Sequence, residues 1–507
     1  MLNNIKRYLC LVLCICLVAV SFVACQNDKE ESNATSITQS NESEAPEYLV
    51  PHLGEADLDG FTLTFLAAQD RADDAYDECQ FNTEEQTNEP VNDAFYNRNR
   101  KIEQEYNCKI QLLTVENATK VVEKIREAVQ VGSADFQVAA AGITYLSTLA
   151  TEGLLYDFNT LQDSKLNLEG DWWDQAAIRD ISIADMLHFI TGDIVVTDNE
   201  ATWAVFFNKT IVETLDLDNP FELVRNNEWT LDKMNEMALT AKTDDGDSTR
   251  TVTGNDQWGL IAQTYDGVAY MWGAEQAMVT KDADDLPVFR LKDQTNIDVW
   301  GDVFTLLVNQ DYTAMADFFY AWNSADYKIV GQNFIDGKAL FRANAISTVN
   351  SAEMREAELS YGILPMPKRD ANQEEYSSSC TVYWATFLTI PTVIDSSEIE
   401  NTTFVLEAMA YLGKEMVTYE YYDKTLKNKR LQDTDSPDML DLVFKNRTFD
   451  LAAIYNWGGT NGALYFYTSL IGAKSDNIVS YTDERLSIFE TAMNETIEAF
   501  QENKAAE

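Results

Sequence analysis

In the first third of the chain, segments with the apolar pattern of a β-strand alternate with segments that have the apolar pattern of an α-helix. An apolar run at 61–68 predicts a strand, and alternating apolar positions at 110–112 predict a second one. The segment 118–131 places its apolar residues on one stripe, which predicts an amphipathic helix. A buried type of strand at 136–141 and a short helix at 145–149 follow. Strand followed by helix, repeated in this way, is the βαβ alternation and predicts an α/β fold with a mainly parallel sheet.

The same alternation continues in the second half of the chain. Residues 203–208 predict a buried strand, and Thr230 is placed to cap the start of a helix. Short strands are predicted at 345–349 and 382–390, and an amphipathic helix closes the chain. The segment 361–368 is predicted to be extended, because a residue that precedes proline is biased away from helical geometry.

The first 25 residues have the pattern of a targeting segment. Lys6 and Arg7 precede an uncharged apolar run at 8–24, which ends in the residues S-F-V-A before Cys25. This end resembles a bacterial lipoprotein signal, in which the cysteine is lipidated and becomes the new N-terminus. An uncleaved membrane anchor or an ordinary secretory peptide are the alternatives. All three place the protein outside the cytoplasm.

Residues 26–48 predict a flexible polar tether. The segment contains a single aliphatic residue larger than alanine, so it cannot bury enough surface to order itself. A chain of this length has a root-mean-square reach of about 25 Å. We therefore expect a folded body held close to the extracellular face of a bacterial membrane by a lipid on Cys25.

Composition and charge narrow the classes of function. The chain has 84 acidic and 37 basic residues, for a formal charge of −47, and only two histidines. Such a charge repels phosphate backbones, so the composition argues against nucleic acid as a partner. The two histidines rule out a histidine-rich metal site. After removal of the signal, Cys79, Cys108 and Cys380 remain, which allows at most one disulfide, and the spacing leaves its pairing open.

Five blocks of sequence resemble extracellular solute-binding proteins of the maltose-binding type. The segment 149–161 (LATEGLLYDFNTL) is similar to their G-L-L-x-D-L motif, and 206–209 (FFNK) to their Y-Y-N-K strand end. Residues 228–232 (EWTLD) resemble their W-T-W-D helix start. The segments 333–341 (NFIDGKALF) and 361–368 (YGILPMPK) resemble two further motifs of the family, in the family's order. Together the blocks cover most of residues 55–415.

The resemblance implies a two-lobed periplasmic-binding-protein fold of type II. Each lobe would be a mainly parallel sheet flanked by helices, and hinge segments would join the lobes. We expect the first lobe at 50–195 plus 361–425 and the second at 196–360 plus 426–507. The family also implies a non-catalytic monomer that needs no cofactor, binds a saccharide and delivers it to the permease of an ABC transporter.

The candidate ligand-binding residues combine aromatic rings with planar polar groups. Aromatic faces stack on the C–H surfaces of sugars, and carboxylates and amides exchange paired hydrogen bonds with hydroxyls. The loops that follow the predicted strands are favoured, because ligands of open α/β sheets bind at the carboxyl ends of strands. The candidates are Asp70, Thr144, Tyr145, Glu200, Trp203, Tyr270, Trp272, Asn350, Tyr383, Trp384 and Trp457. Trp172, Trp173 and Trp322 are further aromatic candidates, although most tryptophans of a chain this size simply pack.

Two other motifs are weaker. The segment 331–339 (GQNFIDGKA) is similar to a phosphate-binding loop, but it has one residue too many between its glycines and lacks the hydroxyl that would hold Mg²⁺. The acidic loop at 244–247 resembles a calcium loop, but Arg250 occupies the position of the glycine that makes the sharp turn. The sequence leaves calcium binding at this loop open.

The same composition also suits other functions. A secreted glycoside hydrolase would share the acidic, tryptophan-rich character, and it would need two carboxyl groups on opposite sides of a bound sugar. The same fold could also hold a peptide or another small solute. The linkage and length of the sugar and the identity of the permease are not specified by the sequence.

Overall fold

The computed structural model describes residues 49–68, 81–247, 249–422, 426 and 433–506. All of these belong to one compact unit, Tyr48–Glu507. The predicted signal, Cys25 and the tether lie outside the described residues, as do Asp70 and Cys79. Cys108 and Cys380 are buried free thiols.

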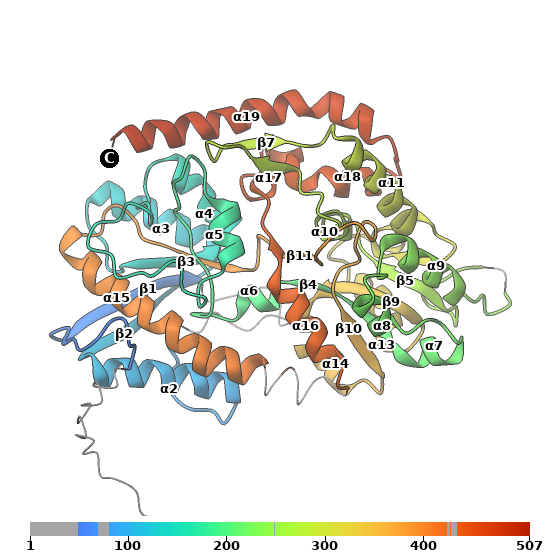
Figure 1. The fold of residues 1–507 in the computed structure, drawn as a ribbon, viewed down its shortest axis with the longest axis horizontal. Coiled ribbons are helices and arrows are strands. Elements are labelled where there is room, and N and C mark those ends of the chain that lie inside the picture. The colour runs from blue at the N-terminus through green and yellow to red at the C-terminus, as the bar shows by residue number, and fades with distance from the viewer. Residues whose placement is uncertain (1–48, 69–80, 248, 423–425, 427–432, 507) are drawn as a thin grey trace, which may run out of the picture. The chain divides into compact units, whose positions relative to one another are not determined.

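The first sheet has four strands in the order β12-β3-β1-β2. The strands β1 (Phe61–Ala68), β2 (Cys108–Val115) and β3 (Val138–Gly142) are parallel, and β12 (Thr386–Thr389) is added antiparallel to β3. The predicted βαβ alternation is confirmed here. Figure 1 shows the helices on both sides of this sheet. They are α2 (Pro90–Glu105), α3 (Ala118–Val131), α4 (Ile143–Thr151) and α15 (Ser396–Leu412).

Helix α3 shows how local sequence sets the element. Asn117 caps its start by accepting a hydrogen bond from the amide of Lys120, and the apolar stripe of Val121, Val122 and Ile125 is buried. The helix ends at Gly132, whose φ of 79° is the left-handed geometry that glycine adopts without strain. The stripe packs onto β1 and β3.

The second sheet has five strands in the order β10-β4-β9-β5-β8. Its parallel part contains β5 (Trp258–Ala262), β8 (Thr313–Met315) and β9 (Ala339–Ala345), whereas β4 (Trp203–Asn208) and β10 (Tyr361–Leu364) are antiparallel to their neighbours. This sheet is therefore mixed, unlike the mainly parallel sheet that the sequence predicts. The chain enters β4 from the first lobe and not from a strand and helix of the same sheet, so the rule that makes βαβ strands parallel does not apply to it.

Two segments differ from the sequence prediction in place. Strand β10 pairs with β4 of the second sheet, although 361–425 was expected in the first lobe. Its Gly362 allows the close approach, because a Cβ there would lie 2.4 Å from the Phe207 ring. The strand expected at 345–349 is instead a 3-10 helix, η2 (Ile346–Asn350), and the strand β9 precedes it.

The remaining elements surround the second sheet and the segments between the sheets. Helix α9 (Leu231–Ala241) packs against β5, α11 (Gln294–Val308) packs against β8, and α13 (Tyr327–Ile335) packs against β9 and β5. The C-terminal helix α19 contacts both α4 and α11. These elements are α5 (Gln175–Ile181), α6 (Thr197–Glu200), α7 (Lys209–Thr214), α8 (Pro220–Arg225), α9 (Leu231–Ala241), α10 (Asp266–Gly273), β6 (Val279–Lys281), β7 (Pro287–Phe289), α11 (Gln294–Val308), α12 (Ala316–Phe319), α13 (Tyr327–Ile335), α14 (Ala352–Glu356), β11 (Ser378–Ser379), η3 (Gly413–Thr418), α16 (Ser436–Lys445), β13 (Arg447–Thr448), α17 (Leu451–Ile454), η5 (Gly459–Asn461), η6 (Ala463–Tyr465), α18 (Phe466–Gly472) and α19 (Ile478–Ala506).

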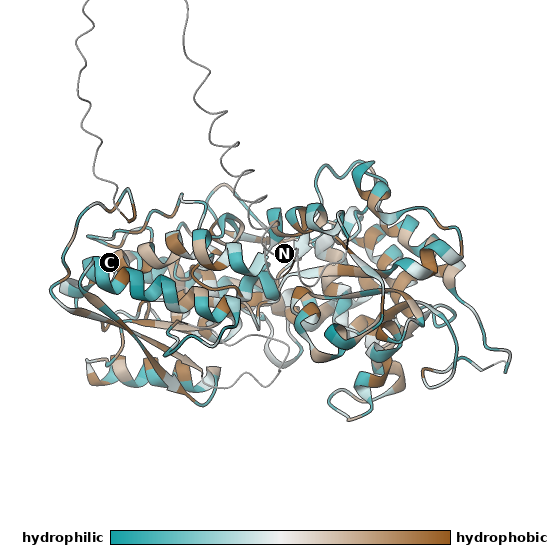
Figure 2. Cartoon of the chain, turned by 90° about the horizontal axis from the view of Figure 1, so that it is seen from below, coloured by the Kyte–Doolittle hydropathy of each residue, from teal (hydrophilic) through white to brown (hydrophobic). Residues whose placement is uncertain are grey.

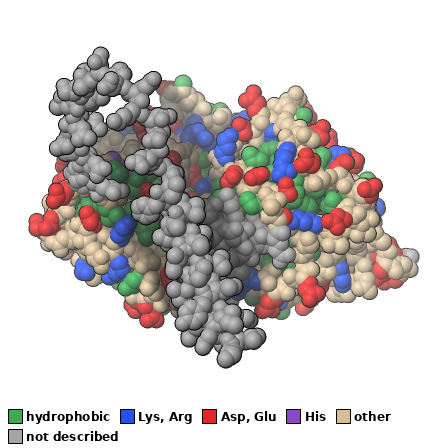
Figure 3. Space-filling view, turned by 60° about the horizontal axis from the view of Figure 1, so that its bottom comes forward, with side chains coloured by type: hydrophobic (Ala, Val, Ile, Leu, Met, Phe, Trp, Pro, Cys, Tyr) green, Lys and Arg blue, Asp and Glu red, His purple; other side chains and the backbone are tan. Residues whose placement is uncertain are grey.

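Apolar residues fill the interior and charged residues cover the outside. The helices in Figure 2 carry hydrophobic residues along one side and hydrophilic residues along the other. On the face shown in Figure 3, acidic side chains are scattered among basic and neutral ones. None of the helices among the described residues combines the length and apolar character needed to cross a bilayer.

Three chain segments between the two sheets lie side by side: α6 with the residues that follow it, strand β11 and strand β13. Charged side chains cluster where they meet. Strands β11 and β13 pair in parallel, and Thr202 bridges to Cys380 just after β11. Arg447 of β13 reaches Asp198 Oδ2 at 2.8 Å and Asp174 Oδ2 at 3.2 Å. We call Arg447, Asp174 and Asp198 the crossing cluster. It joins β13 to two elements of the first half of the chain, α6 and the cap of α5.

Asp193 lies close to the crossing cluster and makes stability depend on pH. Burial raises its pKa to about 7, Asp198 adds to the rise, and a hydrogen bond from the Thr418 hydroxyl (2.6 Å) opposes it. A carboxyl group whose pKa is higher in the folded state than in the unfolded state contributes to the stability of the fold. This contribution is fully present below the unfolded pKa of 3.8. That contribution is lost as pH rises toward 7.

The variant Asp193→Asn removes this titration and keeps an acceptor for Thr418. We expect it to unfold like the wild type at pH 4 and to be more stable by roughly 1–3 kcal/mol at pH 8. Urea denaturation of both proteins at several pH values measures the difference. A constant difference between pH 4 and pH 8 would contradict the assignment.

Candidate functional site

A cavity of about 580 Å³ opens at the carboxyl ends of strands β5 and β8. Its walls come from the residues after these strands, from helix α13, from β9 and from η2. Trp384 also lines it, from the turn before strand β12 of the first sheet. The volume is in the range of small-molecule sites, and the carboxyl ends of strands are where α/β sheets bind ligands.

Asp266 is the most deeply buried acid of this cavity. It begins helix α10, is fully buried, and accepts a hydrogen bond from the Gln263 amide through Oδ2 (3.0 Å). Its Oδ1 has no hydrogen-bond partner among the described residues. Burial raises the pKa of Asp266 well above its ordinary value; the bond from Gln263 opposes the rise, Asp317 adds to it and Arg342 lowers it. A buried oxygen without a partner costs free energy, so a ligand hydroxyl placed here would be bound favourably.

Further polar groups lie around Asp266. The Asp317 carboxylate accepts a hydrogen bond from the Tyr327 hydroxyl at 3.1 Å and one from the Thr264 amide at 2.8 Å. The guanidinium of Arg342 lies against Gly331 of α13, where a Cβ would come within 3.2 Å of it. Glycine at this position therefore leaves room for the arginine in the cavity wall.

Aromatic rings border the opening. Trp322 is 61% exposed and packs edge to face on Tyr327, with ring centres 4.9 Å apart. Trp384, from the turn before β12, also lines the cavity and is half buried. Aromatic rings and hydrogen-bonding groups therefore both line this cavity, as they do where hydroxyl-bearing molecules bind.

Four tyrosines lie near one another, and we call them the tyrosine cluster: Tyr145, Tyr265, Tyr383 and Tyr465. The Tyr383 and Tyr465 hydroxyls lie 2.7 Å apart, and the Tyr145 ring meets the Tyr383 ring edge to face at 6.4 Å. Burial raises the pKa of the Tyr383 hydroxyl, and the nearby hydroxyls of Tyr465, Tyr265 and Tyr145 add to the rise. Gly142 permits this packing, because a Cβ there would lie 2.2 Å from the Tyr383 carbonyl oxygen.

Four of the residues predicted from the sequence come together at this place. Tyr145 and Tyr383 belong to the tyrosine cluster, and Trp384 lines the cavity. Thr144 lies in the first turn of α4 and donates its hydroxyl to the Val382 carbonyl oxygen at 3.2 Å. Thr144 therefore holds the turn that carries Tyr383 and Trp384.

Three other predicted residues, Glu200, Trp203 and Asn350, lie in α6, at the start of β4 or against α6. Glu200 is fully buried in α6 and accepts a hydrogen bond from the Asn350 side chain at 3.2 Å. Trp203 is fully buried at the start of β4, and its ring packs at a tilt on Tyr265, with centres 5.8 Å apart. Trp203 therefore supports Tyr265, and none of the three residues lines the cavity.

The structure places Tyr270, Trp272 and Trp457 in the core. Tyr270 and Trp272 are fully buried in α10, which is packed against α11, α18 and β11. Trp457 is 2% exposed, and its Nε1 donates to the Thr496 hydroxyl of α19 at 2.9 Å. Trp172 and Trp173 lie near His52 and Glu407 in the first lobe, where Trp173 Nε1 donates to Glu407 Oε2 at 2.9 Å.

The variant Trp457→Phe tests this packing role. Phenylalanine removes the hydrogen bond to Thr496 and leaves a small cavity, so we expect a loss of about 1–3 kcal/mol in the free energy of unfolding. Ligand affinity should stay within twofold of the wild type. Chemical denaturation and calorimetric titration measure the two quantities. A stable variant with weakened binding would place Trp457 in the site instead.

Sequence reasoning missed Asp266, Asp317, Arg342 and Tyr465. The sequence contains a signal for Asp266, because the residues Q-T-Y-D, which end in Asp266, directly follow the buried run W-G-L-I-A of β5. The rule that favours loops after strands, applied to this strand as it was to those at 61–68 and 136–141, would have selected Asp266. Arg342 lies inside a strand and Tyr465 in a short 3-10 helix, so neither had such a signal.

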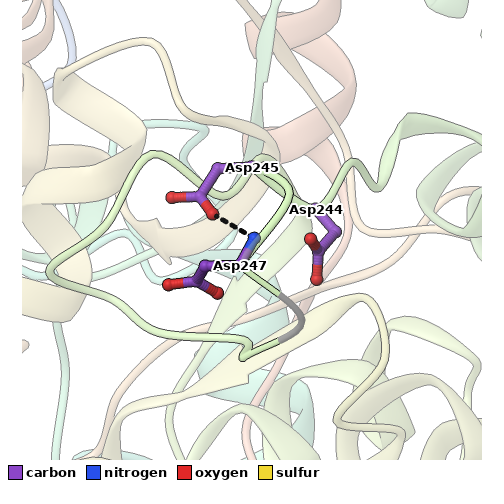
Figure 4. Close-up of side chains that lie close together, drawn as sticks. All are labelled: Asp244, Asp245 and Asp247. Carbon is purple, nitrogen blue, oxygen red and sulfur yellow. Dashed lines mark hydrogen bonds between the residues drawn. The ribbon is translucent and has the colours of Figure 1, made fainter.

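The acidic loop at 244–247 lies elsewhere, between α9 and β5. Figure 4 shows the three exposed carboxylates of Asp244, Asp245 and Asp247, whose nearest oxygens lie within 4.8 Å of one another. The carboxylates accept hydrogen bonds from amides of the same loop, among them Asp247 N–H to Asp245 Oδ1 at 3.2 Å and Gly246 N–H to Asp244 Oδ1 at 2.7 Å. Because these bonds account for the loop conformation, we assign no cation to it.

The chain belongs to the bacterial extracellular solute-binding proteins, whose family model matches residues 99–424. No match was found among curated protein sequences.

Three solved structures share the fold at low identity. The Listeria monocytogenes ABC substrate-binding protein in complex with cycloalternan has a TM-score of 0.52 and 10% identity, over 85% of this chain and 99% of the other. A sugar transporter from Rhizobium etli in an open conformation has a TM-score of 0.54 and 13% identity, over 87% and 99%. UgpB of Mycobacterium tuberculosis with glycerophosphocholine has a TM-score of 0.53 and 14% identity, over 80% and 97%. The expected two-lobed, type II α/β fold is thereby confirmed.

Proposed function

We propose that the protein is a lipid-anchored, non-catalytic substrate-binding protein that captures a neutral saccharide and delivers it to an ABC permease. The observation that carries this proposal is the buried, unpartnered Oδ1 of Asp266 in a cavity bordered by Trp322 and Trp384. The family gives the general role of solute binding. Of the ligands in the similar structures, cycloalternan is a saccharide, and aromatic borders with hydroxyl-binding groups suit that class.

The charges of the cavity wall support a neutral ligand. Two acids, Asp266 and Glu353, and two bases, Lys328 and Arg342, line it, so their formal charges balance. A strongly charged ligand would leave one sign uncompensated in a partly buried space. A saccharide instead offers many hydroxyls that both donate and accept hydrogen bonds.

Hinge closure is the proposed mechanism of capture. All the residues that line the cavity except Trp384 come from the second lobe, while Trp384, Tyr145 and Tyr383 come from segments assigned to the first lobe. A ligand that contacts both sets favours the closed arrangement by the difference in its affinity for the two states. The expected lobe boundaries at 195 and 361 remain part of this proposal, with β10 added to the second lobe.

Uptake by the source bacterium tests the proposal. Cells that lack this gene should fail to import a labelled saccharide, and restoring the full chain should restore import. A Cys25→Ala chain should be released from the membrane and should restore little import, because lipidation needs that cysteine. Import of every saccharide at the wild-type rate without the gene would contradict the proposed role.

A further inference from the structure

We propose that a clasp away from the ligand cavity joins the two lobes, and that Asp285 and Lys504 are the positioning residues that keep it closed. The clasp consists of the turn 183–186, in the expected first lobe, and of the side chains that hold it, which come from the β6–β7 hairpin and from α19. The clasp itself goes beyond the proposed function, whereas its effect on ligand affinity rests on that function.

The turn has an unfavourable backbone conformation. Ile183 and Met186 exchange two backbone hydrogen bonds, at 3.2 Å and 3.0 Å, which close a tight turn. Its two central residues, Ala184 and Asp185, have φ angles of 54° and 63°, in the left-handed region. Alanine rarely adopts this region, because its Cβ comes too close to the backbone carbonyl oxygen. A strained turn of this kind persists where its surroundings hold it in place.

The first group that holds the turn is Asp285, between β6 and β7. Its carbonyl oxygen accepts a hydrogen bond from the amide of Ala184 at 3.1 Å, and its Oδ2 accepts one from the amide of Asp185 at 2.9 Å. Its Oδ1 binds the Lys281 ammonium at 2.5 Å, and the same ammonium donates to the Ser182 hydroxyl at 2.7 Å. The side chains of Lys281 and Asp285 are only 19% and 17% exposed, so salt screens this ion pair less than it screens pairs on the open surface.

The second group is Lys504, in the last turn of α19. Its ammonium donates to the carbonyl oxygen of Ala184 at 2.6 Å. Beside it, the side-chain amide of Asn503 donates to the carbonyl oxygen of Ala150 in α4 at 3.0 Å. The family model matches residues 99–424, so this half of the clasp lies outside the matched segment.

The turn and the groups that hold it are tied to different sheets. Four residues after Met186, the amide of Ile190 donates to the carbonyl oxygen of Leu388 in β12 of the first sheet at 3.1 Å. The β6–β7 hairpin instead leads into α11, which packs against β8 of the second sheet, and α19 packs against α11 as well. The clasp therefore joins the two lobes.

A joint at this place limits how the lobes rotate. Helix α19 is about 43 Å long and contacts both lobes, so the lobes rotate against each other only if the helix bends or one of its ends detaches. In the arrangement that the clasp holds, Trp384 completes the wall of a cavity that the second lobe otherwise makes alone. The clasp thus favours the arrangement in which both lobes meet the ligand. If it opens, the fraction of molecules in that arrangement falls, and the apparent dissociation constant rises in inverse proportion.

Distances between spin labels in the two lobes test the clasp without any ligand. Labels on Val131→Cys and Leu239→Cys occupy exposed positions of α3 and α9, one in each lobe, and labelled protein without these two cysteines gives the background. The test variant carries Asp285→Gly and Lys504→Met. Glycine adopts the φ of 58° at position 285 without strain, so the hairpin keeps its turn while the carboxylate is lost. We expect a broader distribution of distances in this variant than in the wild type.

Calorimetric titration measures the effect of the clasp on binding. The probes are glucose and its α-1,4-, α-1,6- and β-1,4-linked oligomers of two to six rings. For the oligomer that the wild type binds most tightly, we expect the test variant to lose about three- to tenfold in affinity, since only the population of the binding arrangement changes. Thermal midpoints show whether the test variant is folded, and Lys504→Met alone replaces it if it is not.

Lys292→Met is the matched control for Lys504→Met. Lys292 forms an ion pair with Asp483 of α19 at 2.7 Å, but this pair lies within the second lobe. The same chemical change at this position removes a charge from a contact of α19 without touching the clasp. It should alter neither the distances nor the affinity.

Two results would overturn the proposal. An unchanged distribution of distances in a folded test variant would show that the clasp does not hold the lobes. Tighter binding by the test variant than by the wild type would show that the clasp holds an arrangement that opposes binding. If no saccharide binds the wild type, the proposed function fails, and the distances alone then decide whether the clasp exists.

Discussion

Replacing Arg447 by methionine is expected to lower the free energy of unfolding by about 3–5 kcal/mol. Arg447 is a largely buried cation that contacts both Asp174 and Asp198. Methionine fills a similar volume but leaves two buried carboxylates without their counter-charge. Because the crossing cluster joins segments far apart in the sequence, its loss weakens the connection between the sheets as well as the local packing.

Guanidinium denaturation of the wild type and the variant measures this loss. Arg179→Met is the matched control: Arg179 binds Asp180 by two hydrogen bonds, but its side chain is 65% exposed, and exposed pairs contribute about 0–1 kcal/mol. Adding Asp198→Asn to Arg447→Met should recover part of the stability, because it removes one of the uncompensated charges. A loss under 1 kcal/mol for Arg447→Met would show that the cluster does not hold the segments together.

Replacing Asp266 by alanine is expected to weaken saccharide binding by roughly 5- to 150-fold. A buried polar group that loses its hydrogen-bond partner costs about 1–3 kcal/mol, and Asp266 offers its unpartnered Oδ1 to the ligand. Asparagine at the same position keeps the acceptor for the Gln263 amide and for the ligand, so Asp266→Asn should lose less affinity than the alanine variant.

Titration calorimetry of both variants at pH 7 gives the comparison. Asp336→Ala is the control, since Asp336 ends helix α13, is exposed and does not line the cavity. It should bind like the wild type. If Asp266→Ala binds with wild-type affinity, Asp266 does not belong to the site. The thermal midpoint shows whether the alanine variant is folded, and if it is not, the asparagine variant gives the comparison.

The sequence predicted the first lobe better than the second. Strand β1 and helix α3 begin and end where the apolar pattern places them, because both are set by local residues such as Gly132. The direction of β4 and the place of β10 depend on which sheet a crossing segment joins. That is decided by contacts between distant residues, such as Gly362 and Phe207, which a hydrophobic pattern does not contain.

The candidate site was predicted in part for the same reason. Tyr145, Tyr383 and Trp384 were selected because they lie near strand ends, and they do meet at the cavity and the tyrosine cluster. Trp272 and Trp457 have the same chemistry, but α10 and α19 bury them. Whether a tryptophan lines a cavity or fills the core depends on which helices cover it, and residue type alone does not specify this.

The most direct test of the central claim is a calorimetric titration of the protein with glucose and a panel of α-1,4-, α-1,6- and β-1,4-linked glucose oligomers, followed by product analysis of each mixture. The account predicts saturable binding of at least one oligomer to a single site, no new reducing ends, and loss of that binding in Asp266→Ala. Failure of every oligomer to bind, or their cleavage by the protein, would contradict it.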